Sequence, residues 1–248
     1  METNPSRTPR RRLRMARTGV TLSLTLLGII AVSRLASPVA AEPATPINPP
    51  HTGVPDTTPG KIEKTVLAGG CFWGVQAVFQ HTKGVTSAVS GYAGGTLPGP
   101  SYEQVSSGGT GHAESVEITF DPQQISFGHL LQIYFSVAHD PTQLNGQRPD
   151  EGTQYRSEIF ATNGVQQRAA EAYIAELDKA HAFARPIVTK VEPLKTFYRA
   201  EPYHQDYATL HPGNPYIAVY DLPKIANLKK LYPEFYREQA ALAGGDPQ

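Results

Sequence analysis

The chain has 248 residues and a single cysteine, Cys71. One cysteine cannot form a disulfide within the chain, so packing alone must stabilise the fold. Methionine is nearly as scarce, because Met1 and Met15 are the only two and both lie close to the N-terminus. In an oxidising compartment a lone thiol is a liability unless its reactivity is used. Cys71 is therefore the first candidate for a functional residue.

The chain also lacks net charge, with 22 basic and 22 acidic residues. This balance hides an asymmetry, because residues 1–41 carry seven arginines and one acid, Glu2. The remainder of the chain is consequently acidic. An acidic body argues against nucleic acid as a partner, because phosphate backbones are bound by basic surfaces.

No apolar run is long enough for a confident membrane span of about 20 residues. The longest, "VTLSLTLLGIIAV" at 20–32, follows an arginine-rich stretch and precedes the small residues "SPVAA". This order predicts a secretory signal cut after Ala41. The alternative is an uncleaved membrane anchor, and Arg34 just after the apolar run keeps it open. Either way we expect an exported protein, periplasmic or secreted.

The chain divides into three parts by composition. Residues 1–41 form the signal peptide or anchor, and residues 42–61 are rich in proline and threonine without a hydrophobic period. Such a segment is typical of an extended linker. Residues 62–248 remain for one folded domain, which is long enough for a substantial core.

Within this domain, alternating and helical patterns take turns along the chain. We expect strands at 64–70, 84–95, 115–121, 157–162 and 187–193, and helices from 72, over 127–137 and over 163–180. Ser126 and Asn163 are placed to cap the last two helices. The run 225–243 could form a further helix, to which we assign no role. The pattern predicts an α+β fold, a two-layer sandwich in which helices pack on a mixed β-sheet.

Two polar segments, 101–114 and 139–156, are longer than ordinary connections. Long loops of this kind tend to carry function. Both are therefore expected to contribute to the site.

Cys71 follows a strand and two glycines and stands at the start of a helix. The unpaired N–H groups of a helix N-terminus favour a negative charge, so this position should make the thiol more acidic. Phe72 and Trp73 place two aromatic faces beside the sulfur, which suits a small apolar group. The alternative is an inert, buried cysteine in an aromatic core.

The segment "GCFWG" at 70–74 resembles the signature of the peptide methionine sulfoxide reductase A family, which reduces the S epimer of methionine sulfoxide. Further segments resemble the family in the same order. They are "GYAGG" at 91–95, "SYEQV" at 101–105, "TGHAE" at 110–114, "HDPTQ" at 139–143, "GTQYRS" at 152–157 and, more weakly, "YHQDY" at 203–207. The resemblance covers roughly residues 64–216 and implies that 62–248 is a catalytic domain that repairs oxidised methionine, free or in proteins.

The resemblance implies four catalytic residues. Cys71 would attack the sulfoxide sulfur, and Glu114 would supply a proton to the sulfoxide oxygen. Tyr102 and Tyr155 would hydrogen-bond that oxygen. These residue types suit the reaction, because the oxygen leaves only as it gains protons and a buried carboxyl can hold one.

The resemblance also implies three substrate-binding residues. Phe72 and Trp73 would hold the methyl group, and Asp150 would bind the backbone N–H of the substrate residue. Without the resemblance, each of these residues has an ordinary structural alternative in packing or in a turn.

The sequence departs from many family members in having no second cysteine. Ser106 stands where some relatives have one. The sulfenic acid left on Cys71 should therefore be reduced directly by an external thiol, from thioredoxin, a glutaredoxin-type protein or a small molecule. No bound cofactor is expected, and nothing in the pattern demands more than a monomer.

Two other classes of function remain open. A cysteine hydrolase or acyltransferase would use Cys71 with a histidine base such as His112 or His204. A non-catalytic exported binding domain would keep the fold without the chemistry. The histidines, including His139, do not have the spacing of a zinc site, so positioning or packing is the expected role, and no metal is expected.

Overall fold

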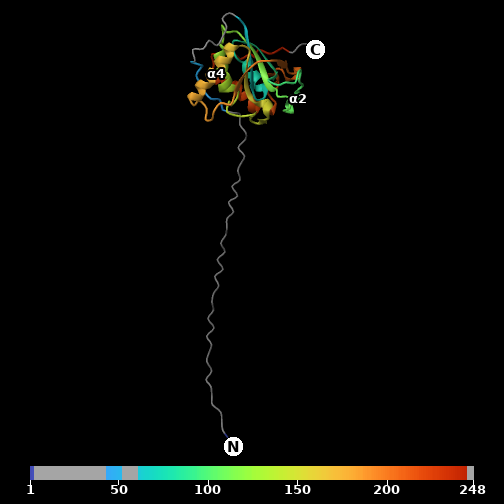
Figure 1. Cartoon of the computed structure of the whole chain (residues 1–248), viewed down its shortest axis with the longest axis vertical. Helices are drawn as coiled ribbons and strands as arrows, with labels where there is room; N and C mark the ends of the chain where they lie inside the picture. The colour runs from blue at the N-terminus through green and yellow to red at the C-terminus, as the bar shows by residue number, and fades with distance from the viewer. Residues whose placement is uncertain (3–42, 52–60, 245–248) are drawn as a thin grey trace. The chain divides into compact units, whose positions relative to one another are not determined.

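The computed structural model of the protein describes residues 1–2, 43–51 and 61–244 (Figure 1). All but the first two residues of the predicted leader lie outside the described residues, so signal peptide and anchor stay alternatives. Across the described ranges, no helix has the length and apolar character to cross a membrane.

Six strands form the central sheet. Their order across the sheet is β7 (Lys190–Pro193), β6 (Ser157–Ala161), β1 (Glu63–Gly69), β3 (Ala113–Phe120), β2 (Val85–Ala93) and β8 (Phe197–Arg199). Neighbours are antiparallel except β6 and β7, which are parallel. The sheet is therefore mixed, and the predicted α+β class is confirmed.

The helices connect these strands. The longer ones are α1 (Phe72–Gln80), α3 (Phe127–Ile133) with its π-helical continuation (Tyr134–Ala138), α4 (Gly164–Lys179) and α6 (Leu222–Leu231). Shorter ones are α2 (Tyr102–Ser106), α5 (Tyr207–Leu210), the π-turn Ile217–Asp221 and the 3-10 turns Thr153–Tyr155 and Pro202–His204. Figure 1 shows α4 and α2 on opposite sides of the body.

Side-chain caps fix where two of the helices begin. The Ser126 hydroxyl accepts a hydrogen bond from the His129 N–H, and the Asn163 side chain accepts from the N–H groups of Val165 and Gln166. Each cap satisfies backbone donors that the first turn leaves unpaired. Both caps were expected from the sequence.

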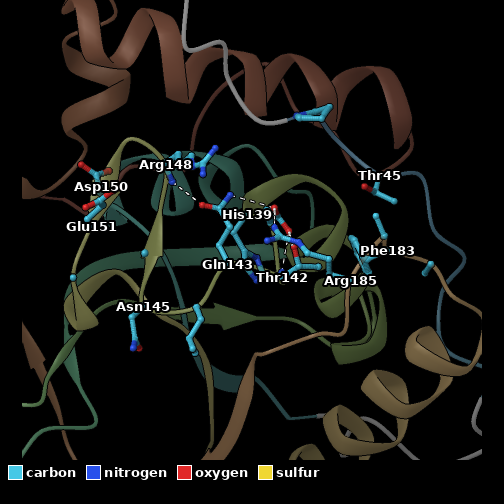
Figure 2. A pocket seen from close by; sticks show the side chains of 17 residues that line it. Thr45, His139, Thr142, Gln143, Asn145, Arg148, Asp150, Glu151, Phe183 and Arg185 are labelled. Atoms are coloured by element: carbon cyan, nitrogen blue, oxygen red, sulfur yellow. Dashed lines mark hydrogen bonds and ion pairs between the residues drawn. The ribbon is translucent and has the colours of Figure 1, made fainter.

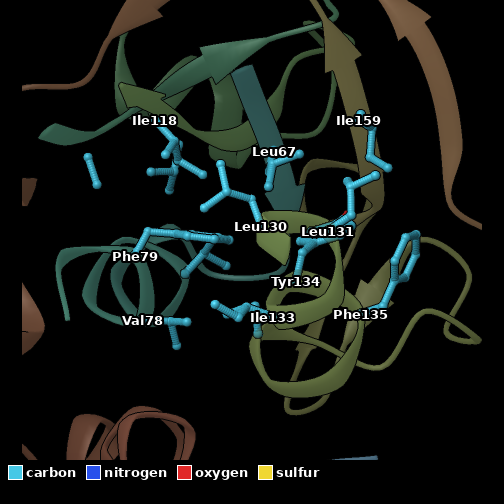
Figure 3. Close-up of a cluster of buried hydrophobic side chains, with 14 of the residues drawn as sticks. Leu67, Val78, Phe79, Ile118, Leu130, Leu131, Ile133, Tyr134, Phe135 and Ile159 are labelled. Carbon is cyan, nitrogen blue, oxygen red and sulfur yellow. The ribbon is translucent and has the colours of Figure 1, made fainter. Parts of the chain in front are cut away.

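The alternation of the strands separates two faces. On β1, Leu67 joins the large core formed with the helices, whereas Val66 and Ala68 face a smaller cluster with Phe160 on the other side. The large core consists of buried strand residues on one side and buried helix residues on the other, as Figure 3 shows for Leu67, Ile118, Val78, Phe79 and Leu130. The main hydrophobic stabilisation therefore comes from one sheet face covered by helices.

Residues 43–51, part of the segment expected to be a linker, pack on the body. The carbonyl of Ile47 accepts hydrogen bonds from Gln132 and Tyr232, and the carbonyl of Asn48 accepts one from Tyr173. Thr45 exchanges two further bonds with Ser136. These nine residues form what we call the N-terminal arm. The boundary between linker and domain stays a prediction, but the arm belongs to the packed structure.

Other segments differ from the sequence-based expectation. The expected strand at 187–193 is ordered as a strand only from Lys190, and the short strand β8 was not foreseen. The expected helix over 225–243 ends at Leu231, because Pro233 cannot continue it. The polar segment 101–114 contains α2. Ser101 and Gln104 cap the N-terminus of this helix with a capping box.

The second polar segment, 139–156, holds a small hairpin. Its strands are β4 (Gly146–Gln147) and β5 (Asp150–Glu151), paired antiparallel. The hairpin carries Asp150 toward the end of β1, where Cys71 begins α1.

Candidate active site

Cys71 is the N-cap residue of α1, directly after β1 and a glycine turn. Gly70 has a φ of 89°, in the left-handed region that favours glycine. A Cβ at Gly70 would lie 2.6 Å from Cβ of Gln147, so a side chain there is also excluded by contact. The turn that presents the thiol thus requires this glycine.

Gln147 locks the hairpin against this turn. Its Nε2 donates to the backbone carbonyl of Asp140 at 2.7 Å, and its Oε1 accepts from the Asp140 N–H at 3.0 Å. Gln147 is almost fully buried, so both bonds are shielded from water. The pair of bonds fixes segment 139–150 beside Cys71.

Glu114 reaches the same point from β3. On that strand it lies on the same face as Val116 and Ile118, which belong to the large core. Its carboxyl therefore points to the helix-covered face. Glu114 is 2% exposed, and its Oε2 accepts a hydrogen bond from the backbone N–H of Phe72 at 3.0 Å. Burial raises the pKa of Glu114 to about 8, against a smaller lowering by the Phe72 N–H. The carboxyl therefore holds a proton at neutral pH, as a proton donor must.

The expected acidity of Cys71 is wrong for the free protein. Burial raises the pKa of the Cys71 thiol well above its usual value, and the nearby carboxyls of Glu114, Asp221 and Asp150 raise it further. The Trp73 backbone N–H, at the helix N-terminus, lowers the pKa but does not prevail. The helix effect is present, but desolvation outweighs it. Cys71 is a thiol in the resting state.

Phe72 and Trp73 form an aromatic wall beside the sulfur. The Trp73 ring stacks on Tyr207 with centroids 4.0 Å apart, and its Nε1 donates to Nδ1 of His204 at 3.2 Å. The Phe72 ring lies 5.0 Å from the His204 ring. These contacts hold both aromatic rings in one orientation and leave an apolar surface at the thiol.

Tyr102 and Tyr155 lie in the same cluster. Burial raises the pKa of both hydroxyls, with further increases from Glu114 and Cys71, so both hydroxyls remain protonated donors. Tyr102 begins α2, and its backbone N–H donates to Glu201 at 2.9 Å. The structure thus brings both predicted tyrosines together with Cys71 and Glu114.

Asp150 stands at the edge of the cluster, on β5. Its Oδ2 accepts a hydrogen bond from the Tyr216 hydroxyl. Burial raises the pKa of Asp150, whereas the Tyr216 hydroxyl and Lys224 lower it. One carboxylate oxygen is thereby fixed.

A cavity of about 1070 Å³ is lined at one end by Asp150. Figure 2 shows Asp150 and Glu151 at one end and Phe183 and Arg185 at the other. Of the predicted site residues, Asp150 alone lines it. The reacting groups therefore cluster beside the large cavity and not within it, and Asp150 joins the two.

The histidines have structural surroundings. Nδ1 of His112 accepts from the Gly95 N–H at 3.1 Å, and its Nε2 lies 2.8 Å from the carbonyl of Leu97. Burial lowers the pKa of His139 to about 3, and its Nδ1 bonds to the carbonyl of Tyr134. His204 holds Trp73. None of the three has a hydrogen bond to Cys71 among the contacts of the described residues, which disfavours a cysteine–histidine hydrolase.

Several residues of this cluster were not predicted as site residues. His204, Tyr207 and Tyr216 come from the segment after β8, for which the sequence offered only the weak match "YHQDY". Glu201 joins Tyr92 to Tyr102, accepting from the Tyr92 hydroxyl at 2.8 Å. In the part of the chain that the structure describes, no group of His, Cys, Asp or Glu could hold a metal ion.

Known proteins resemble this chain in sequence and in fold. The family model for peptide methionine sulfoxide reductase matches residues 63–235. The chain is 61% identical over 180 residues to peptide methionine sulfoxide reductase MsrA 2 of Mesorhizobium japonicum, covering 73% of the chain and 92% of the relative. A relative of the same name from Synechocystis is 46% identical over 217 residues, covering 86% and 99%.

Solved structures agree. The reduced form of Mxr1 from Saccharomyces cerevisiae matches with a TM-score of 0.56 and 35% identity, covering 62% of the chain and 88% of that structure. Methionine sulfoxide reductase A of Corynebacterium diphtheriae matches with a TM-score of 0.53 and 35% identity, covering 72% and 92%. The chain thus belongs to the peptide methionine sulfoxide reductase A family and is an oxidoreductase that reduces methionine sulfoxide.

Proposed function

We propose that Cys71 and Glu114 together carry out this reduction. The sulfur of Cys71 attacks the sulfoxide sulfur while Glu114 protonates the sulfoxide oxygen, and the thiol proton restores the carboxyl. This attack joins the two sulfurs in an intermediate that carries the protonated oxygen as a hydroxyl. The bond between the two sulfurs then breaks as the hydroxyl passes to Cys71, so methionine leaves reduced and Cys71 is oxidised to a sulfenic acid. The observation that supports this most is the protonated, buried Glu114 bonded to the first N–H of the helix that carries Cys71.

Proton transfer also explains how Cys71 can react although the pKa of its thiol is high in the resting state. When Glu114 gives its proton to the substrate oxygen, it becomes the base that accepts the proton of Cys71. The thiol therefore loses its proton only when a substrate oxygen is present to take one. Tyr102 and Tyr155 donate hydrogen bonds to the same oxygen and stabilise the charge that develops on it.

Three contacts in different directions would select the S epimer. The sulfoxide oxygen points to Glu114 and the tyrosines, and the methyl group lies against Phe72 and Trp73. The substrate backbone N–H binds the remaining oxygen of Asp150. When all three substituents of the sulfoxide sulfur are held, only one epimer fits the site. The R epimer should place either its methyl group away from the aromatic rings or its oxygen away from Glu114 and the tyrosines.

The sulfenic acid is then reduced by an external thiol, because this sequence offers no second cysteine. The thiol sulfur bonds to Cys71 and water leaves, with Glu114 placed to protonate the departing hydroxide. A second thiol displaces Cys71 and leaves as a disulfide. Thioredoxin, a glutaredoxin-type protein or a small thiol would serve, and partly exposed Cys71 is open to direct attack.

Single-turnover mass spectrometry tests this proposal. The reduced protein is mixed with one equivalent of blocked methionine (S)-sulfoxide and no thiol. We expect a species one oxygen heavier that dimedone traps at Cys71, with one methionine released, and no reaction with the R epimer. Release of methionine from a protein whose Cys71 remains an unmodified thiol would contradict the mechanism.

We also propose that the protein is exported and acts as a monomer in repair of oxidised proteins outside the cytoplasm. The basic and apolar N-terminal pattern and the small residues before Ala41 support export. N-terminal sequencing of the protein purified from its host separates the alternatives. A start at Glu42 is expected, whereas a start at Met1 in the membrane fraction would indicate the anchor.

A further inference from the structure

Gly74, in the first turn of α1, is covered by a carboxylate from a distant part of the chain. A Cβ at Gly74 would lie 2.1 Å from Oδ1 of Asp221 and 3.1 Å from Nζ of Lys224. Only glycine at this position leaves room for the two charged groups. Positions 71 and 74 lie on the same face of a helix start, so Asp221 stands beside the thiol-bearing residue.

Asp221 itself is unusual among the charged residues. It is fully buried, and neither carboxylate oxygen accepts a hydrogen bond within the described part of the chain. Its nearest cation is Lys224, one turn further on, whose Nζ lies 3.7 Å from Oδ1. A buried, under-satisfied carboxylate is costly, which calls for a functional explanation.

We propose that Asp221 is a positioning residue for the catalytic thiol: its buried charge, only partly balanced by Lys224, disfavours the Cys71 thiolate in the free enzyme. Asp221 acts through the thiol and does not touch the reacting atoms. It is a third ionisable group beside the Cys71 thiol and the Glu114 carboxyl. The inference rests on the proposed role of Cys71.

The limited positive charge of the N-terminus of α1 explains why the charge of Asp221 disfavours the Cys71 thiolate. One of its N–H groups is already used, since Phe72 donates to Glu114. A helix N-terminus offers about half a positive charge, which cannot balance two adjacent anions. Where the thiol titrates, Glu114 and Asp221 are both ionised, so a thiolate at Cys71 would be the third anion beside the same turn.

The charges around Asp221 come from several elements. Cys71 and Asp150 face it from the start of α1 and from β5, and Tyr216 faces it from the start of the π-turn that ends at Asp221. Lys224 is the cation of the group, and it also lowers the pKa values of Asp150 and His139. Burial raises the pKa of Asp221 to about 6, so the carboxylate is ionised where the thiol titrates.

The pH dependence of thiol alkylation in the free enzyme tests the proposal. Iodoacetamide reacts with the thiolate, so its rate reports the fraction of Cys71 that is ionised. Asp221→Asn removes the negative charge and should shift the profile down by about one pH unit, a roughly tenfold faster reaction at pH 8. Lys224→Met removes the cation and should shift the profile up, with slower reaction at the same pH.

The opposite signs distinguish charge from loosened packing. A loosened site would expose the thiol to water and move both profiles down, toward an ordinary cysteine. Lys229→Met, on the same helix but exposed and paired with Glu238, is the matched control and should leave the profile unchanged. An unchanged profile in Asp221→Asn, or shifts of the same sign in both variants, would overturn the proposal. If Cys71 were not the nucleophile, these shifts would still appear but turnover would survive Cys71→Ser, so the two failures are separable.

Discussion

Replacement of Cys71 by serine is expected to lower kcat/KM for methionine (S)-sulfoxide by about 10⁴- to 10⁶-fold, the range typical of a lost nucleophile. A hydroxyl at this position is a far weaker nucleophile than sulfur and forms no stable bond that carries the transferred oxygen. The measurement is steady-state turnover of blocked methionine (S)-sulfoxide with dithiothreitol, followed by chromatography of the product.

The serine variant should fold as the wild type does. Serine is slightly smaller than cysteine and is a favoured N-cap residue, so α1 should start at the same place. Equal circular dichroism spectra and an equal or higher melting temperature serve as the control. Retention of more than a few per cent of the activity by a folded Cys71→Ser variant would exclude Cys71 as the nucleophile.

Replacement of Glu114 by glutamine is expected to lower kcat by about 10²- to 10⁴-fold, the usual contribution of a general acid. Glutamine keeps the shape and can still accept the hydrogen bond from the Phe72 N–H, but it has no proton to transfer. The wild-type rate should fall as pH rises above about 8, where Glu114 loses its proton. The variant should lack that limb, and a variant with an unchanged pH–rate profile would contradict the assignment.

The same carboxyl makes stability depend on pH. Because the pKa of Glu114 is raised from 4.5 to about 8 in the folded state, the native protein binds more protons than the unfolded chain between these values. The associated stability is present below pH 4.5 and is lost as pH rises through 8. Glu114→Gln should therefore melt higher than wild type at pH 9, and the difference should shrink toward pH 5.

Local patterns were sufficient to predict the centre of the site. Gly70 and Cys71 lie where a strand pattern gives way to a helical one, and that junction is decided by neighbouring residues alone. Glu114 required the order of matched segments, because its sequence setting resembles a loop although it belongs to β3. The roles of the two tyrosines and of Asp150 stay proposals, but the structure places all three beside Cys71 and Glu114.

Long-range contacts explain what was missed. Trp73 and His204 are 131 residues apart in the sequence, and no local pattern pairs them. The Asp221 carboxylate reaches α1 in the same way from just before α6. The raised pKa of Cys71 has this origin too, since a helix start is visible in sequence but burial and distant carboxyls are not. The helix N-terminus does lower the pKa of Cys71, as expected from the sequence, but burial raises it by more.

The N-terminal arm places the start of the folded domain before residue 61. The family model begins at residue 63, yet Ile47 packs against the main core and residues 45–48 hydrogen-bond to α3, its π-helical continuation, α4 and the end of α6. A chain cut at residue 63 would remove Ile47 from the core and leave polar groups on these helices without the arm as a partner. The folding unit of this protein is therefore larger than the stretch that the family model describes, and the similarity to the Synechocystis relative, which covers 86% of the chain, also extends beyond that stretch.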